Sequence, residues 1–533
     1  SKDVGYLAYK LGWLLERTTN DASVDSVSPG DIGGLSDISV VEDIPSSMDS
    51  LVPDSGSMDG SPQEDVASTD THSEDAGTPT SIFAAIDVIP NPNNTLSALV
   101  TVETTAEVSV YVSFESEGLG PFQTGATEPG TSHMLTVVGM RQTRDYTLRI
   151  QANLDGDVHT APDVVFTTGE VPGNIPEFEV MVTNEALVTP GITLFGLATA
   201  THDPNEPMYM GVDEAGEIVW YYNDLEADHA ITNREARLLR DGRILISLKN
   251  GYRLIDLAGN TLSEIKGGPN VGSGLHHDVI LLENNNFAAL GTEQQTITVP
   301  ELGGEVLLRG DTIVELDANN DVQWKWSAFD HLDTQSFPGQ LAKKKNKKKG
   351  DHDWTHANAL QSVDDGTALL MSLRHQHEVV KIDRATGEIM WRLGPFGDFE
   401  LLQGEWFYAQ HAPELYDDGR ILIHDNGNER PNSPPYYSRG VMYQLDFEAM
   451  TATQLWSYTC PEYGSFLGDI DLLESGNILV TNGGIRLQGQ GAPPGDGRIL
   501  EVTQEPEPEL VWELRAKEAF IYRSERIGSF WPK

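Results

Sequence analysis

Residues 351–428 carry the pattern that decides the fold: DHDWTHANAL from position 351, ALLMSLRHQHEVVKID from 368 and WFYAQHAPELYDDGRILIHDNGN from 406. In this stretch His356 and His411 each stand at the start of an apolar strand, which is followed by an Asp-Gly turn and a second apolar strand. Upstream, LHHDVILLENNNFAAL at 275–290 repeats the pattern from His277 with an Asn-rich turn. Three histidines therefore hold one equivalent place in three consecutive repeats, and a radial arrangement of the repeats would make their side chains converge.

The repeat extends through the sequence beyond about Pro176. Each copy gives an apolar strand, a turn of the Asp-Gly type, a second apolar strand, a strand carrying Ile-Asp or Leu-Asp, and a strand that ends in Trp. About six copies are present when weaker versions are counted. Four short strands in a period of roughly 40 to 60 residues are typical of propeller blades rather than of helical solenoids. We therefore predict an all-β fold with a six-bladed β-propeller over residues 175–533.

In a propeller the first strand of each blade lines the central channel. His277, His356 and His411 should then lie at one end of three adjacent inner strands, with Arg374 directly after the second strand of the His356 blade. A lone His is more often a structural residue, but scattered structural histidines would not recur at the same position of successive repeats. Strand alternation should turn most of the neighbouring histidines away from the channel. These neighbours are His276, His352, His375, His377 and His424.

Two regions precede the repeats. Residues 1–80 are rich in Ser, Asp, Gly and Pro and have few aromatic residues, so they cannot bury enough apolar surface to offset chain entropy. We predict a disordered acidic leader there. Residues 81–170 show strict alternation of apolar and polar residues, which predicts half-buried strands. We expect a small fibronectin-III-like β-sandwich, with Tyr146 in the position of a tyrosine corner.

The composition excludes several classes of partner. With 82 acidic residues against 35 Lys and Arg, the formal net charge is −47, which repels nucleic acid and anionic membrane surfaces. No apolar run is long enough to span a membrane. The single cysteine, Cys460, excludes an intramolecular disulfide and leaves the redox compartment open. An anionic substrate would need a local positive site, which His and Arg side chains can supply.

Four ordered motifs resemble the bacterial arylsulfate sulfotransferases, a nucleotide-independent arylsulfotransferase family. They are DWTHAN at 353–358, SLRHQ at 372–376, QH at 410–411 and DNG at 425–427. The resemblance covers roughly residues 175–533, and those enzymes also carry a small β-sandwich ahead of a six-bladed propeller. Members of the family move a sulfuryl group from one phenol to another through a sulfohistidine intermediate, in a ping-pong reaction without a nucleotide donor. The resemblance thus implies a sulfotransferase that needs no cofactor and no metal.

Carried over by motif, the resemblance makes His411 the nucleophile. His356, Arg374 and His277 become the groups that hold the sulfuryl oxygens, and Asn358 joins them in binding substrate. His276 stands beside His277 and is the alternative for that position. The partners implied are a small-molecule aryl sulfate donor and a phenolic acceptor, with a homodimer as one option for assembly. An extracytoplasmic location, periplasmic or at the cell surface, is expected if a signal or anchor lies upstream of Ser1.

The sequence departs from familiar members of that family in three ways. It has one cysteine where some members have a disulfide, it has the acidic leader, and it inserts a Lys-rich segment at 343–349 just before the His356 motif. The insertion either draws anions toward the site or is a solvated loop. The natural donor and acceptor are therefore not specified by the resemblance.

The chemistry fits these residue types on its own terms. Displacement at the sulfur of a sulfate ester needs a neutral nitrogen nucleophile, and imidazole provides one near neutral pH. During transfer the sulfuryl oxygens need fixed donors, which a planar guanidinium and imidazole N–H groups can supply. No GxxxxGK[ST] phosphate loop is present in the sequence.

Two other functions remain open from the residues alone. Three convergent histidines could hold Zn²⁺ in a metallohydrolase, although Arg374 beside them disfavours a metal cation. A non-catalytic binding propeller at a surface is the second alternative, because propellers host many functions.

Overall fold

The computed structural model describes residues 81–173, 175–199, 209–223, 234–248, 251–267, 271, 274–335, 350–486 and 495–531. The predicted leader at 1–80 and the Lys-rich segment at 343–349 lie outside the described residues. Within those ranges, the structure has no helix whose length and apolar character would let it cross a membrane.

Residues 83–167 form a β domain around one long strand. Strand β2 pairs with β1 and β4 along its first half and with β3 and β5 along its second half, so it belongs to two sheets. The alternating residues from Val108 to Phe114 point into its core, as predicted. The Tyr146 hydroxyl accepts a hydrogen bond from the Arg141 amide at 2.9 Å. The fibronectin-III-like classification and the domain limits stay predictions. The strands are β1 (Phe83–Pro90), β2 (Ala98–Ser116), β3 (Leu119–Gln123), β4 (Gly130–Val137), β5 (Asp145–Leu154), β6 (Asp157–Thr160) and β7 (Val164–Thr167).

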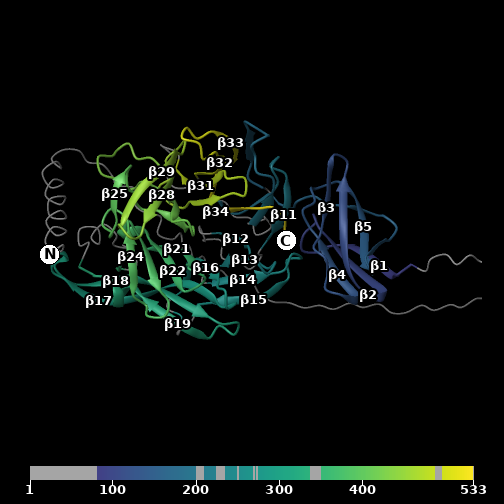
Figure 1. Cartoon of the computed structure of the whole chain (residues 1–533), viewed down its shortest axis with the longest axis horizontal. Coiled ribbons are helices and arrows are strands. Elements are labelled where there is room, and N and C mark those ends of the chain that lie inside the picture. The colour runs from purple at the N-terminus through teal and green to yellow at the C-terminus, as the bar shows by residue number, and fades with distance from the viewer. Residues whose placement is uncertain are drawn as a thin grey trace, which may run out of the picture. The chain divides into compact units, whose positions relative to one another are not determined.

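Strands β8 to β34 form six sheets, the blades of the predicted propeller (Figure 1). Blade 1 contains β34 (Ala519–Ile527), β9 (Ile192–Thr199), β10 (Tyr209–Val212) and β11 (Ile218–Tyr222). Blade 2 contains β12 (Ala236–Leu238), β13 (Ile244–Leu248), β14 (Gly251–Ile255) and β15 (Thr261–Lys266). Blade 3 contains β16 (Leu275–Leu281), β17 (Phe287–Val299), β18 (Gly304–Leu316), β19 (Val322–Ser327) and the short β20 (His352–Asp353).

The other three blades follow the same order from the channel outward. Blade 4 contains β21 (Ala357–Val363), β22 (Ala368–Leu373), β23 (Glu378–Asp383) and β24 (Ile389–Leu393). Blade 5 contains β26 (His411–Leu415), β27 (Arg420–Asp425), β28 (Arg439–Asp446), β29 (Thr451–Thr459) and β25 (Glu400–Gln403). Blade 6 contains β30 (Asp469–Leu472), β31 (Ile478–Ile485), β32 (Asp496–Val502), β33 (Leu510–Ala516) and β8 (Phe178–Val182). The short helices are η1 (Pro300–Leu302), α2 (Ala328–His331) and η2 (Arg374–Gln376).

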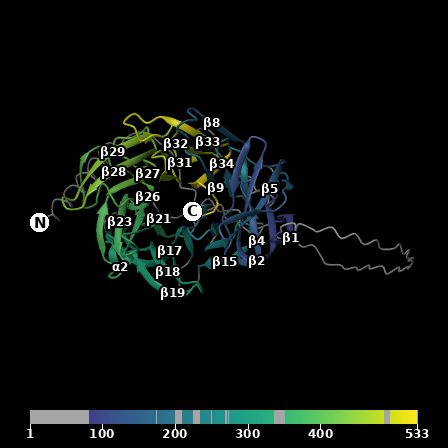
Figure 2. The same cartoon turned by 45° about the vertical axis from the view of Figure 1, so that its right-hand side comes forward.

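The ring is closed twice by strands that are distant in sequence. Strand β34 pairs antiparallel with β9 in blade 1, and β8 pairs antiparallel with β33 in blade 6. Figure 2 shows the sheets standing around a common axis, with these strands completing the circle. A closed ring leaves only the outermost strand of each blade as a free edge.

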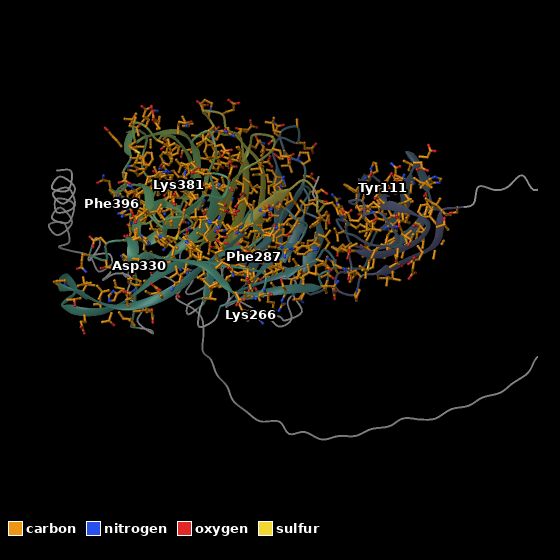
Figure 3. All side chains as sticks on the ribbon, turned by 60° about the horizontal axis from the view of Figure 1, so that its bottom comes forward. Tyr111, Lys266, Phe287, Asp330, Lys381 and Phe396 are labelled. Carbon is orange, nitrogen blue, oxygen red and sulfur yellow. The ribbon has the colours of Figure 1, made fainter. Side chains whose placement is uncertain are left out.

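Six apolar clusters fill the spaces between neighbouring blades, where side chains are densely packed (Figure 3). The Trp residues that end the repeats belong to these clusters and also bind the next blade. Trp326 Nε1 donates to Gly387 O at 2.9 Å, Trp456 Nε1 to Thr503 O at 3.1 Å and Trp512 Nε1 to Glu214 O at 2.8 Å. The recurrent Trp of the sequence therefore joins each of three blades to its successor.

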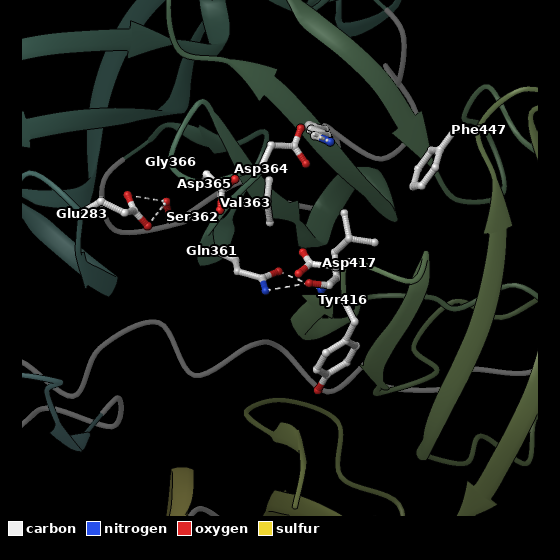
Figure 4. A pocket seen from close by; sticks show the side chains of 12 residues that line it. Glu283, Gln361, Ser362, Val363, Asp364, Asp365, Gly366, Tyr416, Asp417 and Phe447 are labelled. Atoms are coloured by element: carbon white, nitrogen blue, oxygen red, sulfur yellow. Dashed lines mark hydrogen bonds and ion pairs between the residues drawn. The ribbon is translucent and has the colours of Figure 1, made fainter. Parts of the chain in front are cut away.

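Tight turns connect the two inner strands of blades 4 and 5. Gly366 and Gly419 close them with φ of 80° and 81°, a left-handed conformation that favours glycine. Beside these turns the Gln361 side chain spans two blades, because Nε2 donates to Leu415 O at 2.9 Å and Oε1 accepts from Leu415 N at 2.8 Å. A surface cleft of about 410 Å³ opens there (Figure 4), and none of the predicted site residues lines it.

The innermost strand of each blade borders a central cavity of about 400 Å³. Carboxylates from five of these strands or the residues beside them line it, accompanied by Arg237 and Arg523. Arg523 binds Asp278 at 3.1 Å and Glu235 at 3.4 Å. Burial, with neighbouring acidic groups, raises the pKa of Asp469 to about 7 and that of Glu525 to about 7. At neutral pH some of the carboxyl groups in the central cavity are therefore protonated.

Asp469→Asn should stabilise the fold at pH 8, where the buried carboxylate is ionised at a cost. The gain should be on the order of 1–3 kcal/mol and should shrink as pH falls from 7 toward 4, because the native Asp469 then becomes protonated. Chemical unfolding at pH 8 and pH 5 measures it. Glu507→Gln, at an exposed turn of the same blade, is the control. An equal effect of Asp469→Asn at both pH values would contradict the raised pKa.

Candidate active site

Three inner strands are irregular at the end where the predicted histidines lie. Each loses its regular pairing with the next strand of its blade, as in a β-bulge, and a residue with left-handed backbone lies within the strand or directly before it: His277 at φ 56° in β16, His356 at φ 49° just before β21 and Ala412 at φ 44° in β26. Bulges of this kind re-aim side chains, and non-glycine residues in this conformation concentrate at functional sites. The register shifts fall between Leu275 and Val279 in β16, Ala357 and Ala359 in β21, and His411 and Glu414 in β26.

The four predicted groups meet at this end of the channel. The ring centroids of His277 and His356 are 5.1 Å apart. Electrostatic coupling joins His411 to both Arg374 and His356, and His277 to His411. His375 is one of the five neighbouring histidines of which strand alternation was expected to turn most away from the channel, but it belongs to the same cluster, because its ring lies 4.4 Å from that of His356. Alternation fails here because β22 ends at Leu373 and His375 lies in the 3-10 turn η2.

Of the two adjacent histidines, His277 faces the site. Its Nδ1 lies 3.1 Å from the Tyr522 hydroxyl, and its ring is next to that of His356. The side chain of His276 points instead into blade 3, to which both histidines belong, and its Nε2 lies 3.0 Å from an oxygen of Asp311. The left-handed backbone at His277 separates the two directions. This geometry favours His277 over His276 as the predicted site residue.

Asn358 is fully buried behind the histidines. Its Nδ2 donates to Gln410 O at 2.8 Å, which braces the start of β26 next to His411, and its Oδ1 has no hydrogen-bond partner. Its backbone carbonyl accepts from Arg523 at 2.8 Å. In this structure Asn358 links β21, β26 and β34, and its role in substrate binding stays a prediction.

His277 and His411 are neutral imidazoles at pH 7. Burial, together with the neighbouring rings of His276 and His356, lowers the pKa of His277 well below 6.5. Burial and the adjacent Arg374 guanidinium do the same to the pKa of His411. His411 is 3% exposed, and its Nδ1 is bound at 2.6 Å by Asn426 Oδ1. An uncharged imidazole in such a place retains a lone pair.

His356 has a different environment, since a carboxylate holds its ring. Its Nδ1 donates to Asp353 Oδ2 at 2.6 Å. Although burial opposes ionisation, His356 and His375 hold the pKa of Asp353 well below its usual range. Asp353 is therefore an anion at neutral pH and fixes His356 with Nδ1 as donor.

Two of the three guanidinium nitrogens of Arg374 are hydrogen-bonded. Its Nη1 donates to His375 Nε2 at 3.2 Å, and its Nη2 donates to Ser465 O at 3.1 Å. The side chain is 3% exposed, and its Nε has no hydrogen-bond partner among the residues that the structure describes. A buried donor without a partner calls for an explanation, and an anionic ligand is one.

Asp353, His356 and His375 bring ligand atoms within 4.8 Å of one another, close enough to consider a metal ion. His375 does not fit that role. Its Nδ1 donates to Asp353 O at 2.8 Å, and its Nε2 accepts from Arg374, which can only donate. Both nitrogens are thus engaged, and a guanidinium lies where a metal would add further positive charge. The arrangement suits an anion better than a cation.

Sequence reasoning assigned no role to Asp353, Asn426 or Tyr522. Asp353 and Asn426 stand inside the family-like motifs, three residues before His356 and one residue before Gly427, so the signal was present. Tyr522 reaches the site only because β34 pairs with β9 and becomes the innermost strand of blade 1. No local pattern around position 522 indicates this.

The chain resembles known proteins in sequence over most of the propeller. A family model described as Arylsulfotransferase (ASST) matches residues 178–523, well over half of the chain. An arylsulfate sulfotransferase, AssT of Lelliottia amnigena, is 27% identical over 140 residues, or 20% of this chain and 23% of that protein. The match thus spans about a quarter of the length of that curated relative.

Solved structures show only distant likeness. A Bacteroides caccae protein of unknown function has a TM-score of 0.39 and 16% identity, covering 63% of this chain and 98% of its own. The Pseudomonas aeruginosa periplasmic gluconolactonase PpgL has a TM-score of 0.32 and 10% identity, covering 64% of this chain and 97% of its own. Similarities this low do not bear on function.

The neutral state of His277 predicts a specific pH dependence of stability. Its pKa is depressed in the folded chain, so the unfolded chain binds the extra proton, and stability is lost as pH falls below about 6.5. His277→Asn removes this loss. Relative to wild type, the variant should gain about 1 kcal/mol between pH 7.5 and 5.5, as measured by urea unfolding. His159→Asn in the β domain is the control, and a pH-independent difference for His277→Asn would refute the assignment.

Proposed function

Because this chain belongs to the arylsulfotransferase family, we propose that it transfers a sulfuryl group from a phenolic sulfate ester to a phenolic acceptor, through a covalent intermediate on His411. The observation that carries the proposal is a buried, neutral His411 beside an Arg374 whose Nε–H has no partner within the described part of the chain. A nucleophile and a donor for an anionic group thus stand together.

In the first half-reaction a nitrogen of His411 attacks sulfur. The N–S bond forms as the bond between sulfur and the aryl oxygen breaks, and the electron pair leaves with the phenolate. Nucleophilic catalysis of this type splits one difficult displacement into two easier ones. Burial of His411 keeps the imidazole uncharged, so no proton must be removed before attack.

Charge on the transferring group is met by fixed donors. Arg374 is held by His375 and by Ser465 O, so its guanidinium needs little reorganisation when the sulfuryl oxygens approach. His356 is held by the Asp353 carboxylate, which accepts a hydrogen bond from its Nδ1. When Nε2 also carries a proton, that N–H can donate to a sulfuryl oxygen or protonate the departing phenolate.

The second half-reaction reverses these roles with a new phenol. The acceptor gives its proton to His356, its oxygen attacks sulfur, and the N–S bond breaks to regenerate neutral His411. Donor and acceptor then use the site in turn, which predicts ping-pong kinetics. His411, His356 and Arg374 are sufficient for these steps.

His411→Asn should abolish both the burst and steady turnover, because Asn offers no comparable nucleophile. With donor alone, the wild type should release about one equivalent of phenol per site and carry a sulfuryl mass on the peptide containing His411. Rapid-quench kinetics and peptide mass spectrometry measure these. His159→Asn should behave as wild type. A full burst from the His411 variant, or intersecting initial-rate lines for donor and acceptor, would rule out the mechanism.

Arg374→Lys should lower kcat by about 10² to 10³, the usual loss for one preorganised oxyanion donor. A point charge cannot reproduce the planar fork that meets His375, Ser465 and the substrate together. Steady-state kinetics with a chromogenic aryl sulfate measure the loss, and circular dichroism checks the fold. Arg392→Lys, on the outer strand of the same blade, is the matched control. Wild-type rates in Arg374→Lys would remove this residue from the site.

A further inference from the structure

Beyond the proposed function, on which this inference rests, we infer that Asn426 is the positioning residue that sets the tautomer of His411 and so makes Nε2 the nucleophilic atom. Asn426 follows β27 directly and is fully buried. It contacts the nucleophile on one side and a backbone segment on the other. Its effect on His411 depends on which of its two amide atoms faces which neighbour.

The orientation of the Asn426 amide is determined by its surroundings. Two backbone carbonyls, Gly464 O at 2.9 Å and Leu467 O at 2.8 Å, lie against one atom of the amide. Carbonyl oxygens can only accept, so this atom must be the nitrogen, and both of its protons are used. A flipped amide would bring three oxygens together without a proton between them. The amide oxygen therefore faces His411.

This orientation assigns the proton on His411. Asn426 Oδ1 lies 2.6 Å from His411 Nδ1 and can only accept, so Nδ1 carries the hydrogen. Since burial and Arg374 keep the ring neutral, it has a single N–H, and the lone pair belongs to Nε2. The opposite tautomer would direct a lone pair at Oδ1 and leave Nε2 with a proton, unable to attack sulfur.

The segment 464–467, whose carbonyls bind Asn426, also binds Arg374, the proposed hydrogen-bond donor to the sulfuryl oxygens. Ser465, between the two carbonyls that bind Asn426, accepts from Arg374 Nη2 at 3.1 Å. Leu467 has φ 60°, which belongs to the turn that presents its carbonyl. The Ser438 hydroxyl accepts from Gly464 N at 2.9 Å and fixes the start of the segment. One short turn therefore sets the geometry of both nucleophile and arginine.

A second network secures Asn426 from below. Asp425 is fully buried and is bound by Arg430 at 2.6 Å and by Arg439 at 2.8 Å. These pairs fix the end of β27, from which Asn426 projects. A hydrogen bond that sets the tautomer requires rigid support of this kind, because a mobile amide could rotate and present either its oxygen or its nitrogen to the imidazole.

The hydrogen bond also has a role after sulfur has been transferred. When the N–S bond forms at Nε2, the proton on Nδ1 stays, so the ring becomes a cationic sulfo-imidazolium. Its Nδ1–H then donates more strongly to Asn426 Oδ1, as hydrogen bonds from charged donors do. A cationic imidazole is a good leaving group when the acceptor phenol attacks. A neutral amide suits both stages, whereas a carboxylate would bind the charged ring before the reaction starts.

Asn426→Asp tests this with nearly unchanged shape. The carboxylate should raise the pKa of His411, so that the acid limb of the kcat/KM profile moves up by about one pH unit or more. Turnover on the acid side of the displaced limb should fall about tenfold for each pH unit that the limb moves, and should recover as pH rises. The KM for the donor should stay close to that of wild type. An unchanged profile in a folded Asn426→Asp protein would overturn the inference.

Asn426→Ala removes the acceptor without adding charge. The acid limb should move to lower pH, because the hydrogen bond to Asn426 raises the pKa of His411, while kcat falls by about 10² to 10⁴. The upper figure is that of a serine protease in which the tautomer of the catalytic histidine is changed. The Ser438 hydroxyl binds the backbone carbonyls of Asn426 at 3.1 Å and Gly464 at 2.9 Å, so Ser438→Ala loosens the same turn but keeps the Asn426 side chain, and it should lower kcat less than Asn426→Ala does. Equal losses in the two would indicate a purely structural role and refute the inference.

Nitrogen NMR of histidine-labelled protein gives a readout that needs no turnover. The His411 signal, identified by its absence in His411→Asn, should show a protonated Nδ1 and an unprotonated Nε2 at pH 7. In Asn426→Asp the second nitrogen should become protonated at a pH about one unit or more higher than in wild type. A protonated Nε2 in wild type would overturn the inference even if Asn426→Asp fails to fold. The expected tautomer without any phenol burst would instead sink the proposed function and leave the tautomer assignment standing.

Discussion

An imidazole can act as a nucleophile only while it is uncharged, and His411 is kept uncharged by burial beside a guanidinium. Much of the surrounding structure serves this condition. The interior end of a closed ring removes His411 from water, and the Arg374 that raises the cost of protonation is itself tied to η2 and to Ser465. The same burial would disfavour an anionic substrate, so an arginine with an unpartnered donor has to accompany the neutral histidine.

The periodicity of the sequence was sufficient to predict the six blades, and the structure confirms them. The prediction succeeded because the blades repeat one physical unit: two apolar inner strands joined by a tight turn, and outer strands that in three blades carry a Trp bonded to the next blade. The family resemblance is likewise confirmed by the match over residues 178–523. His277, His356 and His411 do converge, since they occupy matching places on adjacent blades, and Arg374 joins them from the turn after β22.

What periodicity could not supply are contacts that depend on local irregularity. The choice between His276 and His277 is made by a left-handed residue within a bulge, and a strict two-residue alternation cannot represent that. Alternation could not predict the position of His375 for a similar reason, because β22 ends at Leu373 and His375 lies in a 3-10 turn. Asn426 acts through carbonyls 38 and 41 residues further along the chain. Such contacts become visible only when the blades are assembled.

The double closure of the ring has a consequence for how the protein is made. His277, His356 and His411 belong to blades 3, 4 and 5, but the Tyr522 and Arg523 that contact His277 and Asn358 belong to β34, near the end of the sequence. During synthesis the ribosome therefore releases three histidines long before the strand that completes their surroundings. An unfinished chain holds these histidines without β34, so the burial that lowers the pKa of His277 is complete only when the ring closes.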